Sequence, residues 1–248
     1  MKPVGIFRHS PGEGPGYFAT FLERHSLPFR VIRVDAGDVV PDTPEAFGGL
    51  CFMGGPMSVN DDLPWIAPTL ALIRAAVASD IPVLGHCLGG QLMAKAMGGS
   101  VGRNAVKEIG WGDVEVLDNP VARAWFGETA ASRKFTAFHW HGETFTIPRG
   151  AAHLLSSAAC AHQAFALGPH LGLQCHVEMT AAMIAQWGEV GADEIAAAGA
   201  TSSVQQPAAM LEDIEARLAA MHAVADRLYG RWIEGLRRDE INRGSCRT

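Results

Sequence analysis

A cysteine occupies an unusual position between a predicted strand and a predicted helix. The apolar run at residues 81–84 predicts a buried strand, a helix-like segment begins at Leu88, and Gly85 and Gly89 flank Cys87 closely. This layout is typical of a nucleophile elbow, a tight turn that lifts its central side chain out of the sheet. At a helix N-terminus, free backbone N–H groups favour a thiolate, and the N–H of Leu88 would face an oxyanion beside the sulfur. The alternative is a buried cysteine at an ordinary glycine-rich turn.

A histidine and a glutamate follow a predicted strand in the second half of the chain. His176 and Glu178 come directly after the strand-like residues 171–175. Residues two apart in an extended chain project from the same face. A carboxylate so placed can hydrogen-bond to the imidazole, fix its tautomer and stabilise the imidazolium. The alternatives are a solvated pair at a strand end or two metal ligands, although no third ligand is evident.

A third motif ends the predicted strand at residues 49–53. Gly54-Gly55-Pro56 stands at its carboxyl end, and glycines allow a backbone N–H to approach a substrate closely. Because ligands bind at the carboxyl ends of parallel strands, we expect this motif to lie beside Cys87 and His176. Taken alone, the motif is equally consistent with a simple turn.

Around these residues, the first half of the chain alternates between strand-like and helix-like segments. Predicted strands cover residues 3–7, 29–34, 49–53 and 81–84, and predicted helices cover residues 17–24, 65–79 and 88–97. This βαβα order predicts an α/β fold with a doubly wound, mostly parallel sheet and helices on both faces.

The second half has a different character. Short strand-like segments at residues 114–117, 133–138, 144–147, 153–157, 163–167 and 171–175 predict an antiparallel addition to the sheet. Residues 207–232 then predict one long helix with an apolar face. That face comprises Met210, Ile214, Leu218, Met221, Ala225 and Leu228. We expect it to pack on the core, with a partner surface as the alternative.

Composition narrows the functional classes. The chain has 248 residues, enough for one large domain, and a net charge of −6, which makes nucleic acid an unlikely partner. Its five cysteines are odd in number and lack CxxC spacing, which argues against a disulfide framework or a zinc site. The sequence shows neither a signal peptide nor an apolar run long enough to cross a bilayer, so we expect a cytoplasmic protein without a membrane partner.

Together, the motifs resemble the class I, or triad-type, glutamine amidotransferases, especially stand-alone members related to the glutaminase domain of GMP synthase. The resemblance covers about residues 1–190, and the motifs that carry it are Gly54-Gly55-Pro56, Gly85-His86-Cys87-Leu88-Gly89-Gly90-Gln91, Lys107-Glu108-Ile109-Gly110-Trp111, His139-Trp140-His141-Gly142-Glu143 and Gln174-Cys175-His176-Val177-Glu178. It implies a flavodoxin-like catalytic domain at residues 1–190. Residues 191–248 are expected to be a C-terminal helical extension packed on the same domain.

The resemblance also implies a role for each matching residue. Cys87 would be the nucleophile, His176 its base and Glu178 the residue that orients the base. Oxyanion or substrate contacts are implied for Gly55, Leu88, Gln91, Trp140, His141 and Gly142. The first two would offer backbone N–H groups to the oxyanion, and Gln91 would hold the glutamine substrate. The backbone of the last three would lie near its amino-acid end.

Two departures from the family pattern shape the expected function. Val177 replaces the usual proline, which should cost little because valine also suits an extended backbone. No segment resembles a synthetase domain or a phosphate-binding GxxxxGK[ST] loop. We therefore expect hydrolysis of glutamine or another γ-glutamyl amide through a glutamyl-thioester, without a metal or an organic cofactor. The ammonia would pass to a separate synthetase or acceptor protein. The alternatives are a stand-alone γ-glutamyl hydrolase or peptidase and, less favoured, a non-catalytic regulatory module.

Overall fold

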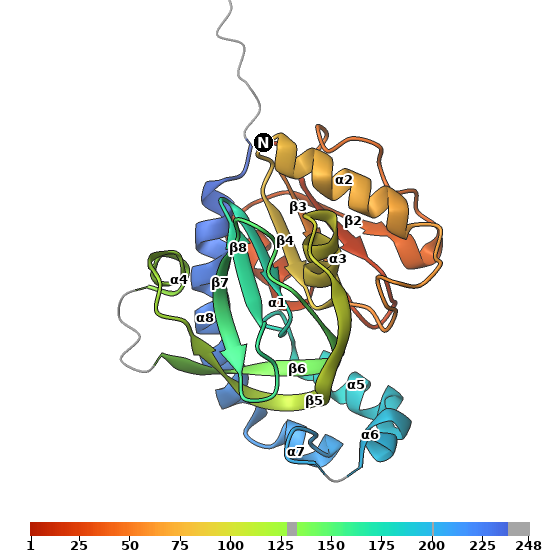
Figure 1. Ribbon diagram of the computed structural model, residues 1–248, viewed down its shortest axis with the longest axis vertical. Helices are drawn as coiled ribbons and strands as arrows, with labels where there is room; N and C mark the ends of the chain where they lie inside the picture. The colour runs from red at the N-terminus through yellow and green to blue at the C-terminus, as the bar shows by residue number, and fades with distance from the viewer. Residues whose placement is uncertain (128–132, 200, 238–248) are drawn as a thin grey trace, which may run out of the picture.

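A nine-stranded mixed sheet forms the centre of the molecule (Figure 1). The computed structural model describes residues 1–127, 133–199 and 201–237. The sheet has the strand order β2-β1-β3-β4-β9-β8-β7-β5-β6. Its strands are β1 (Val4–Arg8), β2 (Phe29–Arg33), β3 (Gly49–Phe52), β4 (Val83–His86), β5 (Val101–Val116), β6 (Lys134–Phe145), β7 (Ala152–Ser157), β8 (Ala164–Leu167) and β9 (His170–Leu173).

The sheet divides at β9 into a parallel part and an antiparallel part. Strands β2, β1, β3, β4 and β9 pair in parallel, whereas β9, β8, β7, β5 and β6 pair in antiparallel fashion. The predicted parallel sheet with an antiparallel addition is therefore confirmed. As a result, β1, β3, β4 and β9 all end at one edge of the sheet, where the three candidate motifs begin.

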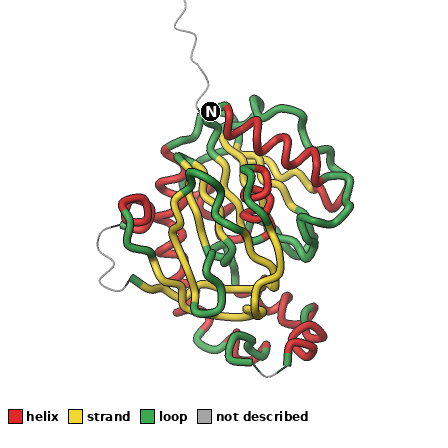
Figure 2. Tube along the Cα trace, in the orientation of Figure 1, coloured by secondary structure: helices red, strands yellow, loops and turns green. Residues whose placement is uncertain are grey.

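Helices cover both faces of the sheet (Figures 1 and 2). They are α1 (Gly16–Arg24), α2 (Ile66–Ala78), α3 (Leu88–Ala96), α4 (Pro120–Phe126), α5 (Ala181–Val190), α6 (Ala192–Ala198), α7 (Pro207–Leu211) and α8 (Ile214–Glu234), with a 3₁₀ turn at Val34–Ala36. One hydrophobic cluster joins α1 and α8 to the sheet, through residues such as Phe18 and Trp232. A second cluster joins α2 and α3 to the opposite face, through residues such as Ile73 and Leu92.

The single long helix predicted for residues 207–232 is wrong. The structure has two helices, α7 and α8, separated at Glu212 and Asp213. Glu212 has an extended backbone and Asp213 has φ +51°, a left-handed conformation that interrupts a helix. The expected apolar face is nevertheless on the core, because Met210 and Met221 are fully buried. Apolar spacing thus identified the buried face correctly, but it carries no information on whether the backbone is continuous.

The middle of the chain forms longer strands than expected. The segments predicted at residues 133–138 and 144–147 belong largely to one strand, β6, which pairs with β5 along most of its length. The polar residues between them obscured this continuity. The strand predicted at residues 171–175 ends earlier, at Leu173. His176 instead forms an isolated bridge with Phe138 of β6, with two backbone hydrogen bonds of 2.8 and 3.2 Å.

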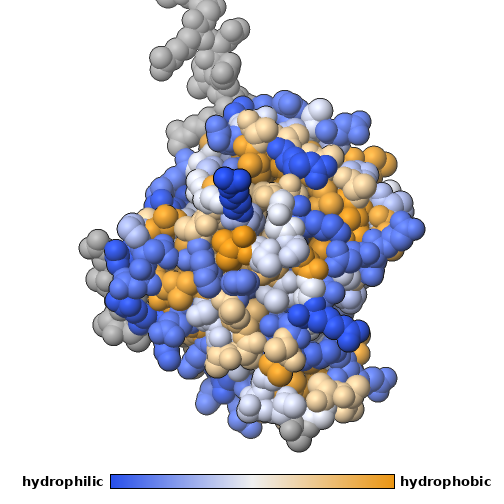
Figure 3. All heavy atoms as spheres, viewed as in Figure 1, coloured by the Kyte–Doolittle hydropathy of each residue, from blue (hydrophilic) through white to orange (hydrophobic). Residues whose placement is uncertain are grey.

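The surface is mixed in character. On the face shown in Figure 3, hydrophobic residues lie in small groups among hydrophilic ones. Val39 and Val190 are the most exposed of the large hydrophobic residues in the described part of the chain. Among the described residues, every helix is too short or too polar to traverse a lipid bilayer.

Candidate active site

Cys87 occupies a strained turn between β4 and α3. Its backbone angles are φ +49° and ψ −106°, a conformation that is costly for a residue with a side chain. The backbone N–H of Cys87 donates to Leu173 O at 2.9 Å, which ties the turn to β9. A Cβ on Gly89 would lie 1.9 Å from Phe52 O, and one on Gly90 would lie 2.3 Å from Leu173 O. The turn therefore fits between β3 and β9 only because these positions have no side chain, as an elbow requires.

His176 and Glu178 form a close buried pair beyond the end of β9. The distance from His176 Nδ1 to Glu178 Oε1 is 2.6 Å. The second carboxylate oxygen, Oε2, accepts the Val177 backbone N–H at 2.9 Å. Both carboxylate oxygens are therefore engaged as acceptors, and this fixes the imidazole with Nδ1 as its donor. Burial alone would raise the pKa of Glu178, but His86 and His176 beside it lower that pKa to about 2.

The electrostatics of His176 connect it to Cys87. Burial acts to lower the pKa of His176, but the negative charges of Glu178 and of a Cys87 thiolate raise it well above its usual value. The remaining ring nitrogen, Nε2, is buried and forms no hydrogen bond with a described residue. The Cys87 side chain is only 6% exposed, and its sulfur lies 3.8 Å from Trp140 O and 3.5 Å from Gln174 Nε2. A protonated imidazole beside a thiol can act as the acid for a departing group.

The two residues expected to bind an oxyanion lie against each other. A Cβ on Gly55 would lie 2.7 Å from the Leu88 side chain. Leu88 is the first residue of α3, so its N–H is one of the unpaired donors of a helix start. Gly54, one residue earlier, lies next to His176, because a Cβ there would lie 3.3 Å from His176 Cε1. The glycine motif after β3 therefore adjoins both the elbow and the imidazole.

The four residues expected near the substrate differ in their placement. Gln91 is buried, and its amide donates to Gln174 Oε1 at 3.1 Å, so it reaches Cys87 through a second amide. The backbone carbonyl of Trp140 lies beside the Cys87 sulfur. The His141 side chain faces Glu108, at 3.0 Å from Oε2, rather than Cys87. Gly142 packs its backbone near the stem of Lys107.

Comparison with known proteins shows the family to which the chain belongs. The sequence model described as glutamine amidotransferase class-I matches residues 21–186. The chain belongs to the class I glutamine amidotransferase family. It is 30% identical over 182 residues to a glutamine amidotransferase-like protein, YfeJ, of Salmonella typhimurium, covering 69% of this chain and 74% of YfeJ. It is 28% identical to gamma-glutamyl peptidase 3 of Arabidopsis thaliana, covering 62% of this chain and 65% of the peptidase.

Two further matches concern length and fold. GMP synthase of Wigglesworthia glossinidia brevipalpis is 26% identical over 53% of this chain, but the match spans only 26% of that synthase. A crystal structure of a glutamine amido transferase from Methylobacillus flagellatus superposes with a TM-score of 0.93 at 43% identity, covering 99% of this chain and 100% of that one. The chain therefore has the fold of this family over nearly its whole length.

Three residues to which the sequence assigned no role lie close to the amidotransferase motifs. The Trp187 ring of α5 packs edge-on against His176, with centroids 5.0 Å apart. His86, whose pKa is lowered by burial, lies 3.7 Å from Glu178 Oε2 and 3.0 Å from the hydroxyl of Tyr229 in α8. The long C-terminal helix thus supports the Glu178 carboxylate through His86. Only the position of Trp187 shortly after the His-x-Glu motif hinted at any of these contacts.

A buried polar cluster lies beside the candidate amidotransferase site. Ligand atoms of Glu108, His139 and His141 all lie within 4.8 Å of one another, a set that could hold a metal ion. However, Glu108 already accepts hydrogen bonds of 2.7 Å from both Ser157 and Gln163. Burial lowers the pKa of His139 to about 4, and its Nε2 lies 3.3 Å from Gly112 O. We interpret this set as a polar network that fixes β6, because both carboxylate oxygens of Glu108 already accept hydrogen bonds, although His141 Nε2 is buried without a hydrogen-bond partner among the described residues.

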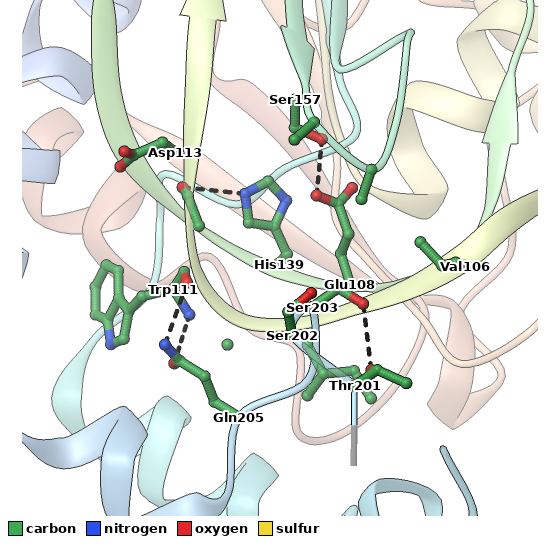
Figure 4. Close-up of a pocket in the computed structure, with 15 residues that line it drawn as sticks. Val106, Glu108, Trp111, Asp113, His139, Ser157, Thr201, Ser202, Ser203 and Gln205 are labelled. Atoms are coloured by element: carbon green, nitrogen blue, oxygen red, sulfur yellow. Dashed lines mark hydrogen bonds between the residues drawn. The ribbon is translucent and has the colours of Figure 1, made fainter. Parts of the chain in front are cut away.

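The network borders a pocket between β5 and the segment before α7 (Figure 4). The pocket has a volume of about 440 Å³, and Glu108, His139, Ser157 and Gln205 contribute to its lining. In the close-up, Ser157 points at Glu108 and the Gln205 amide pairs with the Trp111 backbone. Cys87 does not line this pocket. The pocket is therefore separate from the candidate triad.

The thiols of the described cysteines should differ sharply in reactivity. Burial, followed by the charge of Glu178, raises the pKa of Cys51 and of Cys175, and burial also raises the pKa of Cys160. All three side chains are at most 1% exposed. Cys87 is more accessible and begins a helix, so it should alkylate fastest of these four. Mass spectrometry after brief iodoacetamide treatment measures the order.

The alkylation experiment has two controls. Prior incubation with a γ-glutamyl substrate analogue should protect Cys87 selectively, whereas denaturation should equalise the four rates. Faster labelling of Cys51 or Cys175 in the folded protein would contradict the assignment. The fifth cysteine, Cys246, lies outside the described residues and is scored separately.

Proposed function

We propose that the chain hydrolyses a γ-glutamyl amide through Cys87, His176 and Glu178. The observation that carries the proposal is the convergence of a strained cysteine at a strand-to-helix turn with a buried imidazole–carboxylate pair. Family membership supports it independently. A pair of backbone donors next to the sulfur, at Gly55 and Leu88, would complete the requirements for acyl transfer.

The reaction would proceed in two half-reactions, acylation of Cys87 and hydrolysis of the thioester. The Cys87 thiolate attacks the γ-carbonyl carbon, and the N–H groups of Gly55 and Leu88 stabilise the oxyanion. The C–N bond then breaks as His176 transfers its proton to the leaving nitrogen, which gives a glutamyl-thioester. Water attacks the thioester while His176 accepts a proton from it, and cleavage of the C–S bond releases glutamate and restores the Cys87 thiolate beside protonated His176. Glu178 keeps the imidazole oriented throughout.

Two forms of this proposal differ in the identity of the leaving amine. The similarity to GMP synthases, which are glutamine-hydrolyzing enzymes, favours ammonia that is passed to a separate partner. The similarity to gamma-glutamyl peptidase 3 favours an amine or peptide and a chain that acts alone. A non-catalytic module is disfavoured because the cysteine at the turn and the imidazole–carboxylate pair are all present.

A substrate screen tests the proposal. Purified protein is incubated with glutamine, glutathione and γ-glutamyl amines, and both ammonia and glutamate are measured. Weak release of ammonia from glutamine alone indicates an enzyme that depends on a partner. Efficient release of glutamate from γ-glutamyl amines or peptides indicates a stand-alone hydrolase. Absence of turnover with every compound would refute hydrolysis.

A further inference from the structure

The loop between β1 and α1 brings an additional carboxylate to the candidate site. β1 ends at the same edge of the sheet as β3, β4 and β9, so the loop at residues 9–15 begins beside the three motifs. Trp187 Nε1 donates to Gly12 O at 2.9 Å, and the Tyr17 N–H donates to Glu178 O at 2.8 Å. Both ends of the segment that contains Glu13 are therefore fixed to residues around the His176–Glu178 pair.

The Glu13 carboxylate lies over Gly54. A Cβ on Gly54 would lie 2.1 Å from Glu13 Oε2 and 3.3 Å from His176 Cε1. The carboxylate and the edge of the imidazole thus occupy the same side of Gly54, close enough for one small group to touch both. Gly54 directly precedes Gly55, a proposed oxyanion donor. The close approach depends on glycine, because any side chain at residue 54 would displace the carboxylate.

Among the described residues, the positive charge that acts on this carboxylate is that of the nearby His176 imidazole. No residue in the described ranges donates a side-chain hydrogen bond or an ion pair to Glu13, although it feels the charges of His176 and Glu178. The pKa of Glu13 is raised to about 7, because burial and, to a smaller extent, the charge of Glu178 raise it more than the charge of His176 lowers it. A partly desolvated carboxylate that forms no direct ion pair is stabilised by a further positively charged group that reaches it.

The proposed chemistry determines which group reaches it. In γ-glutamyl hydrolysis, the leaving nitrogen receives its proton from His176, so the rest of the leaving amine must extend past the imidazole. The γ-glutamyl carbonyl, by contrast, is held between Cys87 and the backbone of Gly55 and Leu88. Because Glu13 Oε2 and the edge of the His176 ring lie on the same side of Gly54, we place the leaving amine, which His176 protonates, beside Glu13.

We propose that Glu13 is a specificity-determining residue that selects γ-glutamyl substrates whose leaving amine carries a second, positively charged group. A mono-γ-glutamyl diamine is such a substrate. A leaving group that carries a carboxylate, as in a γ-glutamyl peptide, meets repulsion from the same oxygen atoms. This inference rests on the proposed γ-glutamyl hydrolysis and names the substrate class for it.

A matched series of leaving groups tests the inference. The three substrates are γ-glutamyl amides of 1,4-diaminobutane, butylamine and 4-aminobutyrate, which share a four-carbon chain but end in a cation, a methyl group and an anion. The wild-type kcat/KM should be roughly ten-fold higher for the diamine than for butylamine, and lowest for aminobutyrate, since a partly buried charged hydrogen bond has about this effect. Glu13→Gln should reduce the diamine-to-butylamine ratio to near one.

The control is Glu23→Gln. Glu23 lies exposed on α1, so this change removes the same charge without altering the site, and the wild-type ratios should persist. Equal rates for the three substrates in the wild-type protein would overturn the inference while leaving γ-glutamyl hydrolysis intact. An equal loss for all three substrates in Glu13→Gln, with a shifted pH profile, would overturn it too, because Glu13 would then act through His176. Failure of the wild-type protein to cleave any γ-glutamyl compound would refute the proposed function, and the inference with it.

Discussion

Replacement of Cys87 by alanine is expected to reduce γ-glutamyl hydrolysis by roughly 10⁴-fold or more, because no second nucleophile can form the thioester. The other described cysteines cannot substitute. Cys51, Cys160 and Cys175 are buried, and burial raises the pKa of each thiol. Rates of glutamate release under saturating substrate measure the loss. Calorimetry should show that the variant still binds substrate, since the proposed backbone donors remain.

The matched control for this change is Cys160→Ala. Cys160 is 1% exposed and contacts Thr144, so its replacement removes a buried thiol of the same size away from the candidate triad. It should retain wild-type activity at a temperature well below its melting point. Full activity in Cys87→Ala would remove the nucleophile assignment, and family membership would then describe the fold alone.

The elbow and the imidazole–carboxylate pair could be predicted because both are encoded locally. The turn at Cys87 needs glycines within two residues of the sulfur, and the sequence places Gly85 and Gly89 there. His176 and Glu178 are two residues apart, so little tertiary information was needed to expect a contact. The strand pattern alone does not explain the contact between His176 and Glu178, however. Both residues lie beyond the end of β9, and pairing of the His176 backbone with Phe138 fixes the imidazole.

The remaining site residues depend on packing that local patterns do not encode. Glu13 reaches Gly54 because a loop is tied down by Trp187, and Tyr229 reaches His86 because α8 lies across one face of the sheet. Each contact joins segments far apart in the sequence. Helical periodicity indicated that α8 would be buried, but not which of its side chains would meet a polar group of the site.

The predicted role of Gln91 shows a related limit. The family resemblance implies a substrate contact, whereas the structure has the Gln91 amide donating to Gln174, which in turn donates to Cys87. A direct contact with substrate would require Gln91 to exchange this partner. The residue type was consistent with binding, but the partner already present was not visible in the sequence. Gln174 is the amide in contact with the sulfur, and only a structure could distinguish the two.

Replacement of Glu178 by glutamine is expected to reduce kcat by roughly 10²–10⁴-fold, less than the loss of the nucleophile. Both carboxylate oxygens accept hydrogen bonds, one from His176 and one from the Val177 backbone. Glutamine has a single acceptor oxygen. If that oxygen faces His176, the amide NH₂ opposes the Val177 N–H, and a buried donor loses its partner at a cost of about 1–3 kcal/mol. If the NH₂ faces His176, it stabilises the wrong imidazole tautomer.

The pH profile separates this mechanism from simple loss of structure. The charge of Glu178 helps to raise the pKa of His176, so its removal should lower that pKa. The protonated imidazole is then lost at lower pH, and the alkaline limb of the kcat/KM profile should move towards acid. Glu189→Gln, on the exposed side of α5, removes an equal charge and should leave the profile in place. A folded Glu178→Gln protein as inactive as Cys87→Ala would mean that the carboxylate takes part in proton transfer itself. An unshifted profile with wild-type kcat would mean that Glu178 does not orient His176 at all.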